Sequence, residues 1–160
     1  MNFRYLAGAA AISLVVLFGC GTRKNALSTD DRVEVTVLQI NDVYEINPLE
    51  GGKTGGLARV AYLAKKYKKE NPNFVAVLSG DFLNPSAINM MKFEGKRLKG
   101  RHMVSVLNEF LDIATFGNHE FDIEVDELQE RLNESKFNWV STNVSKVENG
   151  KTMPFYQKVG

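Results

Sequence analysis

The sequence predicts an α/β fold in which β-strands and α-helices alternate along the chain. Short apolar runs alternate with amphipathic segments, which is the pattern of a parallel sheet covered by helices. A polar side chain also follows each of the first three apolar runs, at positions Asp42, Asp81 and Asn118. Open α/β sheets bind ligands at the carboxyl ends of their strands, so we expect these three side chains to converge at one edge.

The N-terminal segment, residues 1–19, is predicted to be a signal peptide. It combines Arg4 with an apolar stretch over residues 6–18, which is short for a membrane span and typical of a secretory signal. Cys20 follows and is the only cysteine, so no disulfide can form within the chain. The sequence Leu17-Phe18-Gly19-Cys20 resembles the lipobox of bacterial lipoproteins, which implies a lipid on Cys20.

The residues after Cys20 are expected to tether a domain to the bacterial cell envelope. The resemblance implies that Gly21, in place of an acidic residue, favours the outer over the inner membrane, so we expect a periplasmic or outer-membrane location. Residues 20–31 are polar and aperiodic, as a tether should be, and residues 32–160 remain for one domain. The chain has 20 Lys and Arg residues against 19 Asp and Glu residues, a balance that does not favour a nucleic-acid-binding surface.

The predicted elements of the domain follow in order. Strands are expected over residues 33–40, 74–78, 113–116 and 137–144, and a fifth strand over residues 155–159. A glycine-rich loop is expected over residues 48–56, and helices over residues 57–69, 86–93, 101–111 and 125–135. The lysines at positions 65–69 are expected to be solvated in the last helical turn, where cations suit the dipole. His102 is expected at the surface, without a metal role.

The segment Gly117-Asn118-His119-Glu120-Phe121-Asp122 brings three useful chemical groups together. The Asn118 amide oxygen can ligate a hard metal ion, and His119 can donate a proton to a phosphoryl or leaving-group oxygen. Asp122, three residues after the histidine, can accept its other N–H and fix its tautomer. Such a triplet could also be an ordinary turn, but Asp42 and Asp81 occupy equivalent positions after two other strands. The repetition therefore favours a functional site.

The donor atoms of this site indicate the chemistry. Two carboxylates and an amide suit a divalent ion such as Mn²⁺, Mg²⁺ or Zn²⁺. A carboxylate shared between two ions holds a dinuclear site together, and such a site polarises phosphoryl oxygens and activates water for in-line attack. The sequence contains no Gly-x-Ser-x-Gly elbow and no P-loop. The pattern therefore predicts a phosphoesterase.

Three motifs, Asn41-Asp42, Ser79-Gly80-Asp81 and the segment 117–122, resemble the first three motifs of the calcineurin-like metallophosphoesterases. The resemblance is to the 5′-nucleotidase and 2′,3′-cyclic phosphodiesterase branch and extends from Val33 to Gly160. It implies the N-terminal part of an α/β/β/α sandwich, two divalent metal ions, and a nucleotide or other phosphoester as substrate. It also implies that Asp42 ligates one ion, Asp81 bridges both and Asn118 ligates the second. His119, oriented by Asp122, would then stabilise the transferring phosphoryl group.

Two features depart from the family pattern. The first motif normally reads Asp-x-His, whereas Tyr44 stands at the histidine position, and tyrosine ligates these ions poorly at neutral pH. We therefore expect a weakened first metal position that loses a ligand, recruits Glu45 or water, or uses phenolate. Because the chain has only two histidines, the later histidine motifs are missing, and we expect an incomplete, inactive fragment of a longer lipoprotein. The alternative is a non-catalytic surface lipoprotein that uses the fold for binding.

Overall fold

The computed structural model of this 160-residue chain describes residues 32–156. The chain divides into two units, Met1–Val33 and Glu34–Gly160, and the fold described below belongs to the second unit. The predicted signal peptide, the tether and the lipidation site at Cys20 lie outside the described residues. Within the described part, no helix combines the length and the apolar character that crossing a membrane requires.

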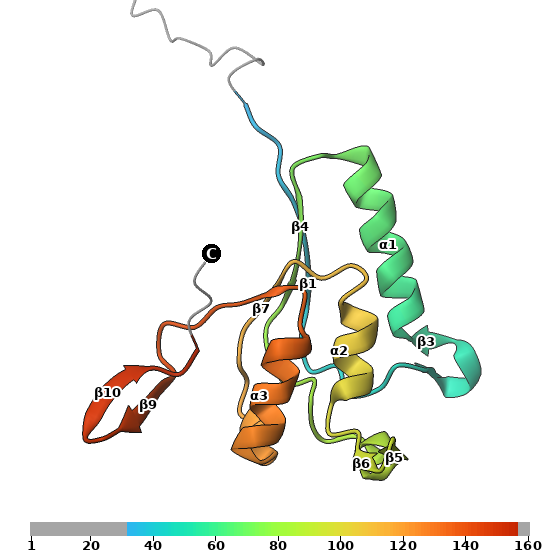
Figure 1. Cartoon of the computed structure of the whole chain (residues 1–160). Coiled ribbons are helices and arrows are strands. Elements are labelled where there is room, and N and C mark those ends of the chain that lie inside the picture. Colours follow the sequence, from blue (N-terminus) through green and yellow to red (C-terminus); the bar gives the residue numbers. More distant parts are fainter. Residues whose placement is uncertain (1–31, 157–160) are drawn as a thin grey trace, which may run out of the picture. The chain divides into compact units, whose positions relative to one another are not determined.

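Four parallel strands form the central sheet in the order β1-β4-β7-β8 (Figure 1). Their bounds are Thr36–Ile40 for β1, Phe74–Leu78 for β4, Ile113–Ala114 for β7 and Asn138–Trp139 for β8. The register places Ile40 opposite Leu78, Leu78 opposite Ala114, and Ala114 opposite Trp139. The predicted α/β fold with a parallel sheet is therefore confirmed, although β1, β7 and β8 are shorter than expected.

Three helices connect the strands, namely α1 (Leu57–Glu70), α2 (Arg101–Leu107) and α3 (Val125–Glu134). Figure 1 shows them side by side along one side of the sheet. α1 turns Leu57 and Ala64 into the core, and the lysines of its last turns are exposed as predicted. α3 begins at a capping box, in which Glu124 and Glu127 each accept a hydrogen bond from the other residue's backbone N–H. Each helix is therefore held by an apolar face or a defined cap.

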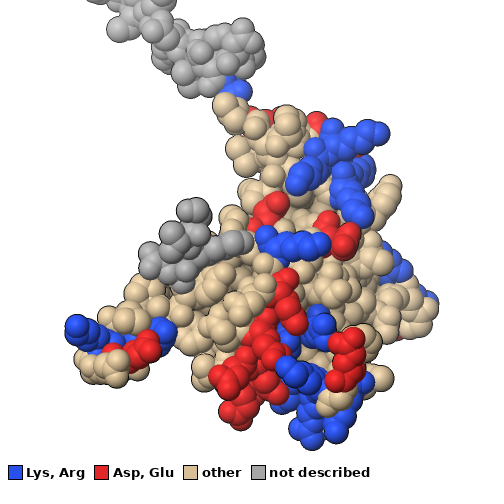
Figure 2. Space-filling view, in the orientation of Figure 1, with Lys and Arg blue, Asp and Glu red and all other residues tan. Residues whose placement is uncertain are grey.

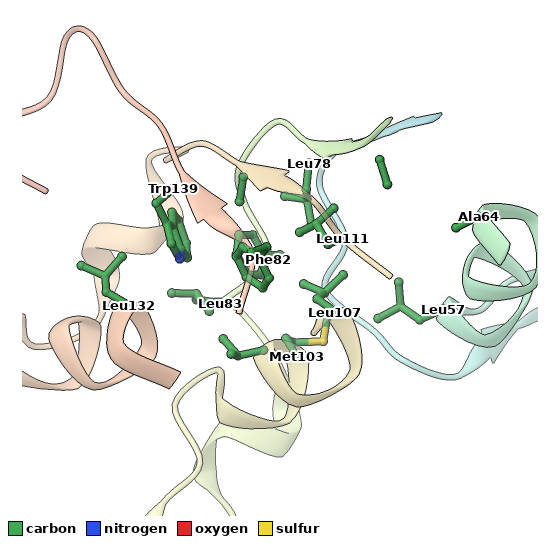
Figure 3. Packing of buried hydrophobic residues seen from close by; sticks show 14 of the residues in the cluster. Leu57, Ala64, Leu78, Phe82, Leu83, Met103, Leu107, Leu111, Leu132 and Trp139 are labelled. Carbon is green, nitrogen blue, oxygen red and sulfur yellow. The ribbon is translucent and has the colours of Figure 1, made fainter. Parts of the chain in front are cut away.

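The core lies between the helices and one face of the sheet (Figure 3). Along β4, Phe74, Ala76 and Leu78 are buried, whereas the alternate residues Val75 and Val77 are only partly buried. The core side chains labelled in Figure 3 are Leu57, Ala64, Leu78, Phe82, Leu83, Met103, Leu107, Leu111, Leu132 and Trp139. The second sheet of the expected sandwich is not present among residues 32–156.

Aromatic side chains pack against one another in the part of the core near β8. The Trp139 ring stacks on Phe82 and on Phe116, with ring centroids 5.3 Å and 4.7 Å apart. Phe82 follows the candidate ligand Asp81, and Phe116 precedes the Gly-Asn-His motif. Stacked aromatic pairs contribute about 0.5–1.5 kcal/mol beyond the area they bury. The cluster therefore fixes the chain immediately beside two of the candidate site segments.

The predicted helix over residues 86–93 is wrong. This segment forms a 3-10 turn, Ala87–Met90, followed by strand β5 (Lys92–Phe93), which pairs with β6 (Lys96–Arg97). The buried side chain of Asn89 explains the difference. Its amide donates to the Leu83 carbonyl oxygen at 2.8 Å, and its oxygen accepts from the Gly100 backbone N–H at 2.7 Å. These tertiary hydrogen bonds hold the turn and outweigh local helix propensity.

Two hairpins were not predicted from the sequence. The loop over residues 48–56 contains strands β2 (Pro48–Leu49) and β3 (Thr54–Gly55), joined by a 3-10 turn, Glu50–Gly52. Strands β9 (Ser145–Glu148) and β10 (Lys151–Pro154) form a hairpin that the sequence analysis missed. Its turn, Asn149-Gly150, has positive φ at both residues, which is the standard Asn-Gly hairpin signal. The predicted fifth strand is not seen at Phe155 and Tyr156, and its remaining residues lie outside the described range.

Charges of both signs are interleaved on the face shown in Figure 2. Lysines of the β5–β6 region meet carboxylates of α3: Lys96 Nζ lies 2.8 Å from Glu130 Oε1, and Lys99 Nζ lies 3.7 Å from Glu127 Oε2. Arg131 of α3 is buried and bonds the carbonyl oxygens of Leu98 and Lys99. These pairs attach the β5–β6 hairpin to α3.

His102 was expected at the surface, and the structure shows it half-buried, with its ring nitrogens turned away from solvent. Both of its ring nitrogens are buried and lack a hydrogen-bond partner within residues 32–156. Burial lowers the pKa of His102, and the negative charge of Glu45 opposes this shift only in part. The folded state therefore favours the neutral imidazole.

Replacing His102 with leucine is expected to stabilise the folded chain by about 1 kcal/mol at pH 8, because two unpaired polar atoms leave the interior. The gain should grow as the pH falls through 6.5, the ordinary pKa of histidine. In that range the unfolded wild-type chain binds a proton that the folded chain excludes, so wild-type stability falls. Urea unfolding at pH 8 and pH 5.5 measures both effects. His102→Gln is the control, because it removes the titration but keeps a polar side chain; a gain that does not depend on pH would contradict the buried, neutral imidazole.

Candidate functional site

Three loops leave the carboxyl ends of β1, β4 and β7 and contact one another. The Asp42 backbone N–H donates to the Gly80 carbonyl oxygen at 3.3 Å, which joins the first loop to the second. The His119 backbone N–H donates to Asp81 Oδ1 at 2.9 Å, which joins the second loop to the third. The structure thus brings Asp42, Asp81 and the Asn118-His119 pair to one edge of the sheet.

The two candidate carboxylate ligands have an unusual backbone conformation. Asp42 has a φ angle of 53° and Asp81 has a φ angle of 61°, both in the left-handed region. Few residues other than glycine adopt this region, and such strain, which costs on the order of 1–3 kcal/mol, is concentrated at functional sites. Equivalent strain at the ends of two neighbouring strands therefore supports a functional role for both residues.

Two glycines allow the second and third loops to touch. Gly80 has a φ angle of 84°, and a Cβ atom added there would lie 2.3 Å from the Gly117 backbone nitrogen. A Cβ atom added at Gly117 would lie 2.1 Å from Asp81 Oδ1. Neither position has room for a side chain. The approach of Asp81 to the Asn118-His119 pair therefore depends on glycine at both positions.

The Asp42 carboxylate accepts a hydrogen bond on each oxygen. Asn41 Nδ2 donates to Oδ2 at 2.6 Å, and the Tyr44 hydroxyl donates to Oδ1 at 3.2 Å. Partial burial and the hydrogen bond to Asp42 raise the pKa of Tyr44, which keeps its hydroxyl protonated at neutral pH. The Tyr44 ring also meets the His119 ring edge-on, with centroids 5.9 Å apart. Tyr44 is therefore a hydrogen-bond donor to Asp42 here.

His119 and Asp122 form a tight pair. His119 Nδ1 lies 2.6 Å from Asp122 Oδ2, and Asn84 Nδ2 donates to the same oxygen at 3.3 Å. The hydrogen bond to Asp122 raises the pKa of His119, and the same bond lowers the pKa of Asp122. The proton is thus held on Nδ1, which fixes the tautomer and leaves Nε2 for other partners.

A pocket of about 290 Å³ borders this site. Asp42, Tyr44 and Glu45 line one part of it, and apolar side chains line most of the remainder, among them Val43, Leu49, Leu57 and Val60. A larger hollow of about 430 Å³ lies between the β5–β6 hairpin and α3 and contains none of the candidate residues. The smaller pocket, which reaches Asp42, is therefore the one relevant to the site, and Glu45 faces it.

The donor atoms at this edge are of the chemical type that binds a divalent metal ion. Among residues 32–156, no group of three or more His, Cys, Asp and Glu side chains is arranged to hold a metal ion. The carboxylates of Asp42 and Asp81 and the Asn118 amide nonetheless offer the oxygen donors that Mg²⁺ and Mn²⁺ prefer.

The role of Glu120 was not predicted from the sequence. This side chain is fully buried, and its carboxylate accepts hydrogen bonds from the backbone N–H groups of Asp81, Phe82, Leu83 and Gly117. Three of these four partners lie 37 to 39 residues earlier in the chain. Local sequence patterns carry no signal for contacts at such separations.

Comparison with known proteins identifies relatives of the described domain. Residues 35–159 match the family model described as calcineurin-like phosphoesterase. The 2′,3′-cyclic-nucleotide 2′-phosphodiesterase/3′-nucleotidase of Yersinia enterocolitica is 34% identical over 140 residues, which are 82% of this chain and 21% of that protein. The trifunctional nucleotide phosphoesterase protein YfkN of Bacillus subtilis is 34% identical over 96 residues, which are 56% of this chain and 7% of that protein.

A solved structure also resembles the fold. A putative 5′-nucleotidase from Staphylococcus aureus superposes with a TM-score of 0.59 at 18% identity, covering 75% of this chain and 25% of that chain. This likeness concerns the fold alone. The chain spans a quarter or less of the length of these three proteins.

Proposed function

This chain belongs to the calcineurin-like phosphoesterases, hydrolases that use divalent metal ions, and from that membership we propose that the native gene product hydrolyses phosphoesters of nucleotides. The observation that carries the proposal is the meeting of Asp42, Asp81 and the Asn118-His119 pair at one sheet edge. The substrate class follows from similarity over 82% of the chain to a protein named as a cyclic-nucleotide phosphodiesterase and 3′-nucleotidase. We therefore propose nucleoside monophosphates and 2′,3′-cyclic nucleotides as substrates.

Asp42, Asp81 and Asn118 are the residues proposed to hold two divalent ions, with Asp81 shared between them. When bound, such ions withdraw charge from phosphoryl oxygens and activate water for attack. The position beside Asp42 is proposed to be the weaker, because Tyr44 stands where the family pattern has histidine and its hydroxyl already donates to Asp42 Oδ1 at 3.2 Å. Glu45, which lines the adjacent pocket, is proposed as an additional oxygen donor.

His119 is proposed to stabilise the phosphoryl group and to donate a proton to the leaving oxygen. Its Nδ1 proton is engaged by Asp122, so that Nε2 is the nitrogen available to substrate. The raised pKa favours the imidazolium, which carries positive charge that suits an anionic phosphoryl group. Asp122 in turn fixes the ring, and Asn84 supports Asp122.

We also propose that a lipid on Cys20 attaches the protein to the cell envelope on its periplasmic side. This proposal rests on the apolar segment over residues 6–18 and on the lipobox-like residues 17–20. A lipid anchor would hold the phosphoesterase domain next to the membrane while residues 20–31 act as a tether.

Metal removal tests the proposed function. The native gene product is expected to hydrolyse 2′,3′-cyclic AMP, 3′-AMP or 5′-AMP when Mn²⁺ is supplied, because the reaction needs the ion at the carboxylates. Dialysis against EDTA should reduce release of a nucleoside monophosphate from the cyclic nucleotide, or of inorganic phosphate from the monophosphates, to the rate without enzyme, and added Mn²⁺ should restore it. Absence of hydrolysis of all three substrates in the presence of Mn²⁺ would contradict the proposal. That result would favour the alternative, a non-catalytic surface lipoprotein.

A further inference from the structure

Glu120 connects the two loops that carry most of the candidate site residues. Its Oε2 atom accepts from the backbone N–H groups of Asp81 at 2.8 Å and Gly117 at 2.7 Å. Its Oε1 atom accepts from the backbone N–H groups of Phe82 at 2.8 Å and Leu83 at 3.1 Å. One side chain therefore bonds four amides, three in the loop after β4 and one in its own loop after β7.

The chemistry of these partners requires a carboxylate. All four are donors, and an ionised carboxylate offers about four acceptor sites and no donor. Hydrogen bonds to an ionised acceptor are also stronger than those between neutral groups. Glu120 is fully buried, so water does not compete for these amides. No neutral side chain of similar size can accept from four donors in this arrangement.

A second cross-connection runs in the opposite direction between the same loops. Asp81 Oδ1, in the loop after β4, accepts from the His119 backbone N–H at 2.9 Å. The backbone N–H of Asp81 is itself bonded by Glu120, and Asp81 has the strained φ angle of 61°. Glu120 therefore holds the backbone of the candidate metal ligand Asp81 by a hydrogen bond. The Asp81 side chain in turn holds the backbone of His119.

We propose that Glu120 is a positioning residue that sets the distance between Asp81 and the Asn118-His119 pair by holding the amides of both loops. It contacts no proposed substrate group, because all four of its bonds are to backbone. This inference rests on the proposed function only for the metal-binding role of Asp81 and Asn118. The arrangement of the loops stands on the geometry alone.

Glu120→Gln is the variant that tests this inference. Glutamine has nearly the same shape, but its –NH₂ group must replace one of the two oxygens. Two backbone N–H groups then face a donor instead of an acceptor. Arg131→Gln is the matched control, because Arg131 is also a buried charged residue with several hydrogen bonds, but it lies in α3 and bonds Leu98 and Lys99. Glu120→Asp, which keeps the charge on a shorter side chain, serves if Glu120→Gln does not fold.

Two measurements on the full chain separate positioning from general stability. Calorimetric titration with Mn²⁺ should show an affinity lowered by about 10- to 100-fold in Glu120→Gln, as is usual when a residue supporting a ligand is lost. Arg131→Gln should bind Mn²⁺ like the wild type even if it unfolds at lower urea concentration. In the metal-free chain, NMR hydrogen exchange should show lost protection at the amides of Asp81, Phe82, Leu83 and Gly117. Protection in the β1–β4 pairing should persist.

The possible results separate a failure of the Glu120 inference from a failure of the proposed function. Unchanged Mn²⁺ affinity and unchanged amide protection in Glu120→Gln would overturn the inference. An equal loss of Mn²⁺ affinity in Arg131→Gln would also overturn it, because the effect would then reflect stability alone. Absence of Mn²⁺ binding by the wild-type chain would contradict the proposed function. The exchange measurement, which needs no metal, would still decide whether Glu120 holds the two loops together.

Discussion

Replacing His119 with alanine is expected to lower kcat for nucleotide hydrolysis by about 10²- to 10⁴-fold, the usual contribution of a positioned proton donor. The imidazole is partly exposed at the site, where it pairs with Asp122 and meets the Tyr44 ring edge-on. Its removal therefore leaves the core intact. Stability and KM should change little, because the lost interaction belongs to the transition state.

Substitution of the neighbouring Asp122 is expected to lower kcat less than the loss of His119 does. Asp122→Asn should give a smaller loss of kcat in the same direction, because the ring remains but loses the carboxylate that holds the proton on Nδ1. Steady-state kinetics with Mn²⁺ and a cyclic nucleotide measure both variants. His102→Gln is the control, since His102 is the only other histidine and lies in α2.

The same variants discriminate between an enzyme and a binding protein. If the His119→Ala protein hydrolysed nucleotides at the wild-type rate, His119 would have no role in the reaction. If the wild-type protein showed no hydrolysis and His119→Ala changed only the free energy of unfolding, the non-catalytic alternative would be supported. A loss of kcat with an unchanged urea midpoint is the result that the site geometry favours.

The parts of the fold that sequence predicts well are those that local patterns determine. Strand β4 forms at its predicted residues because Phe74–Leu78 is a continuous apolar run between two turn signals. The prediction over residues 86–93 failed because Asn89 bonds residues six and eleven positions away, and Met90 and Met91 are each 60% exposed. Apolar residues at the surface resemble a core pattern in sequence. Only the tertiary contacts distinguish the two.

In the candidate site, too, local sequence patterns predict some residues, whereas others depend on tertiary contacts. The positions of Asp42 and Asp81 follow from the rule that polar residues after parallel strands share one edge. The contact between His119 and Asp122 lies within three residues and can be anticipated from spacing. Glu120 cannot, because most of its partners are distant in sequence and its burial depends on how two loops pack. Long-range backbone contacts therefore mark the limit of what this sequence reveals.

Replacing Gly80 with alanine is expected to have the second large effect, on activity and stability together. The added Cβ atom would lie 2.3 Å from the Gly117 nitrogen, 2.6 Å from its Cα atom and 2.9 Å from the Phe116 carbonyl carbon. All three are backbone atoms, so no side-chain rotation relieves the clash and the loops must separate. A shift of about 1 Å at a reacting centre can lower the rate by about 10²-fold, and we expect at least that loss of kcat.

Gly95 provides the control for the strained backbone, because it has the same φ angle of 84° but no atom within 4 Å of an added Cβ. Gly95→Ala should therefore lose only about 1–2 kcal/mol of stability, the cost of a left-handed alanine, and should keep full activity. Urea unfolding and kcat are measured for both variants. Equal stability losses, with activity retained in Gly80→Ala, would show that the loops can part without consequence. Because the two glycines share the same φ angle, the difference between the variants isolates the contact that holds Asp81 against the Asn118-His119 loop.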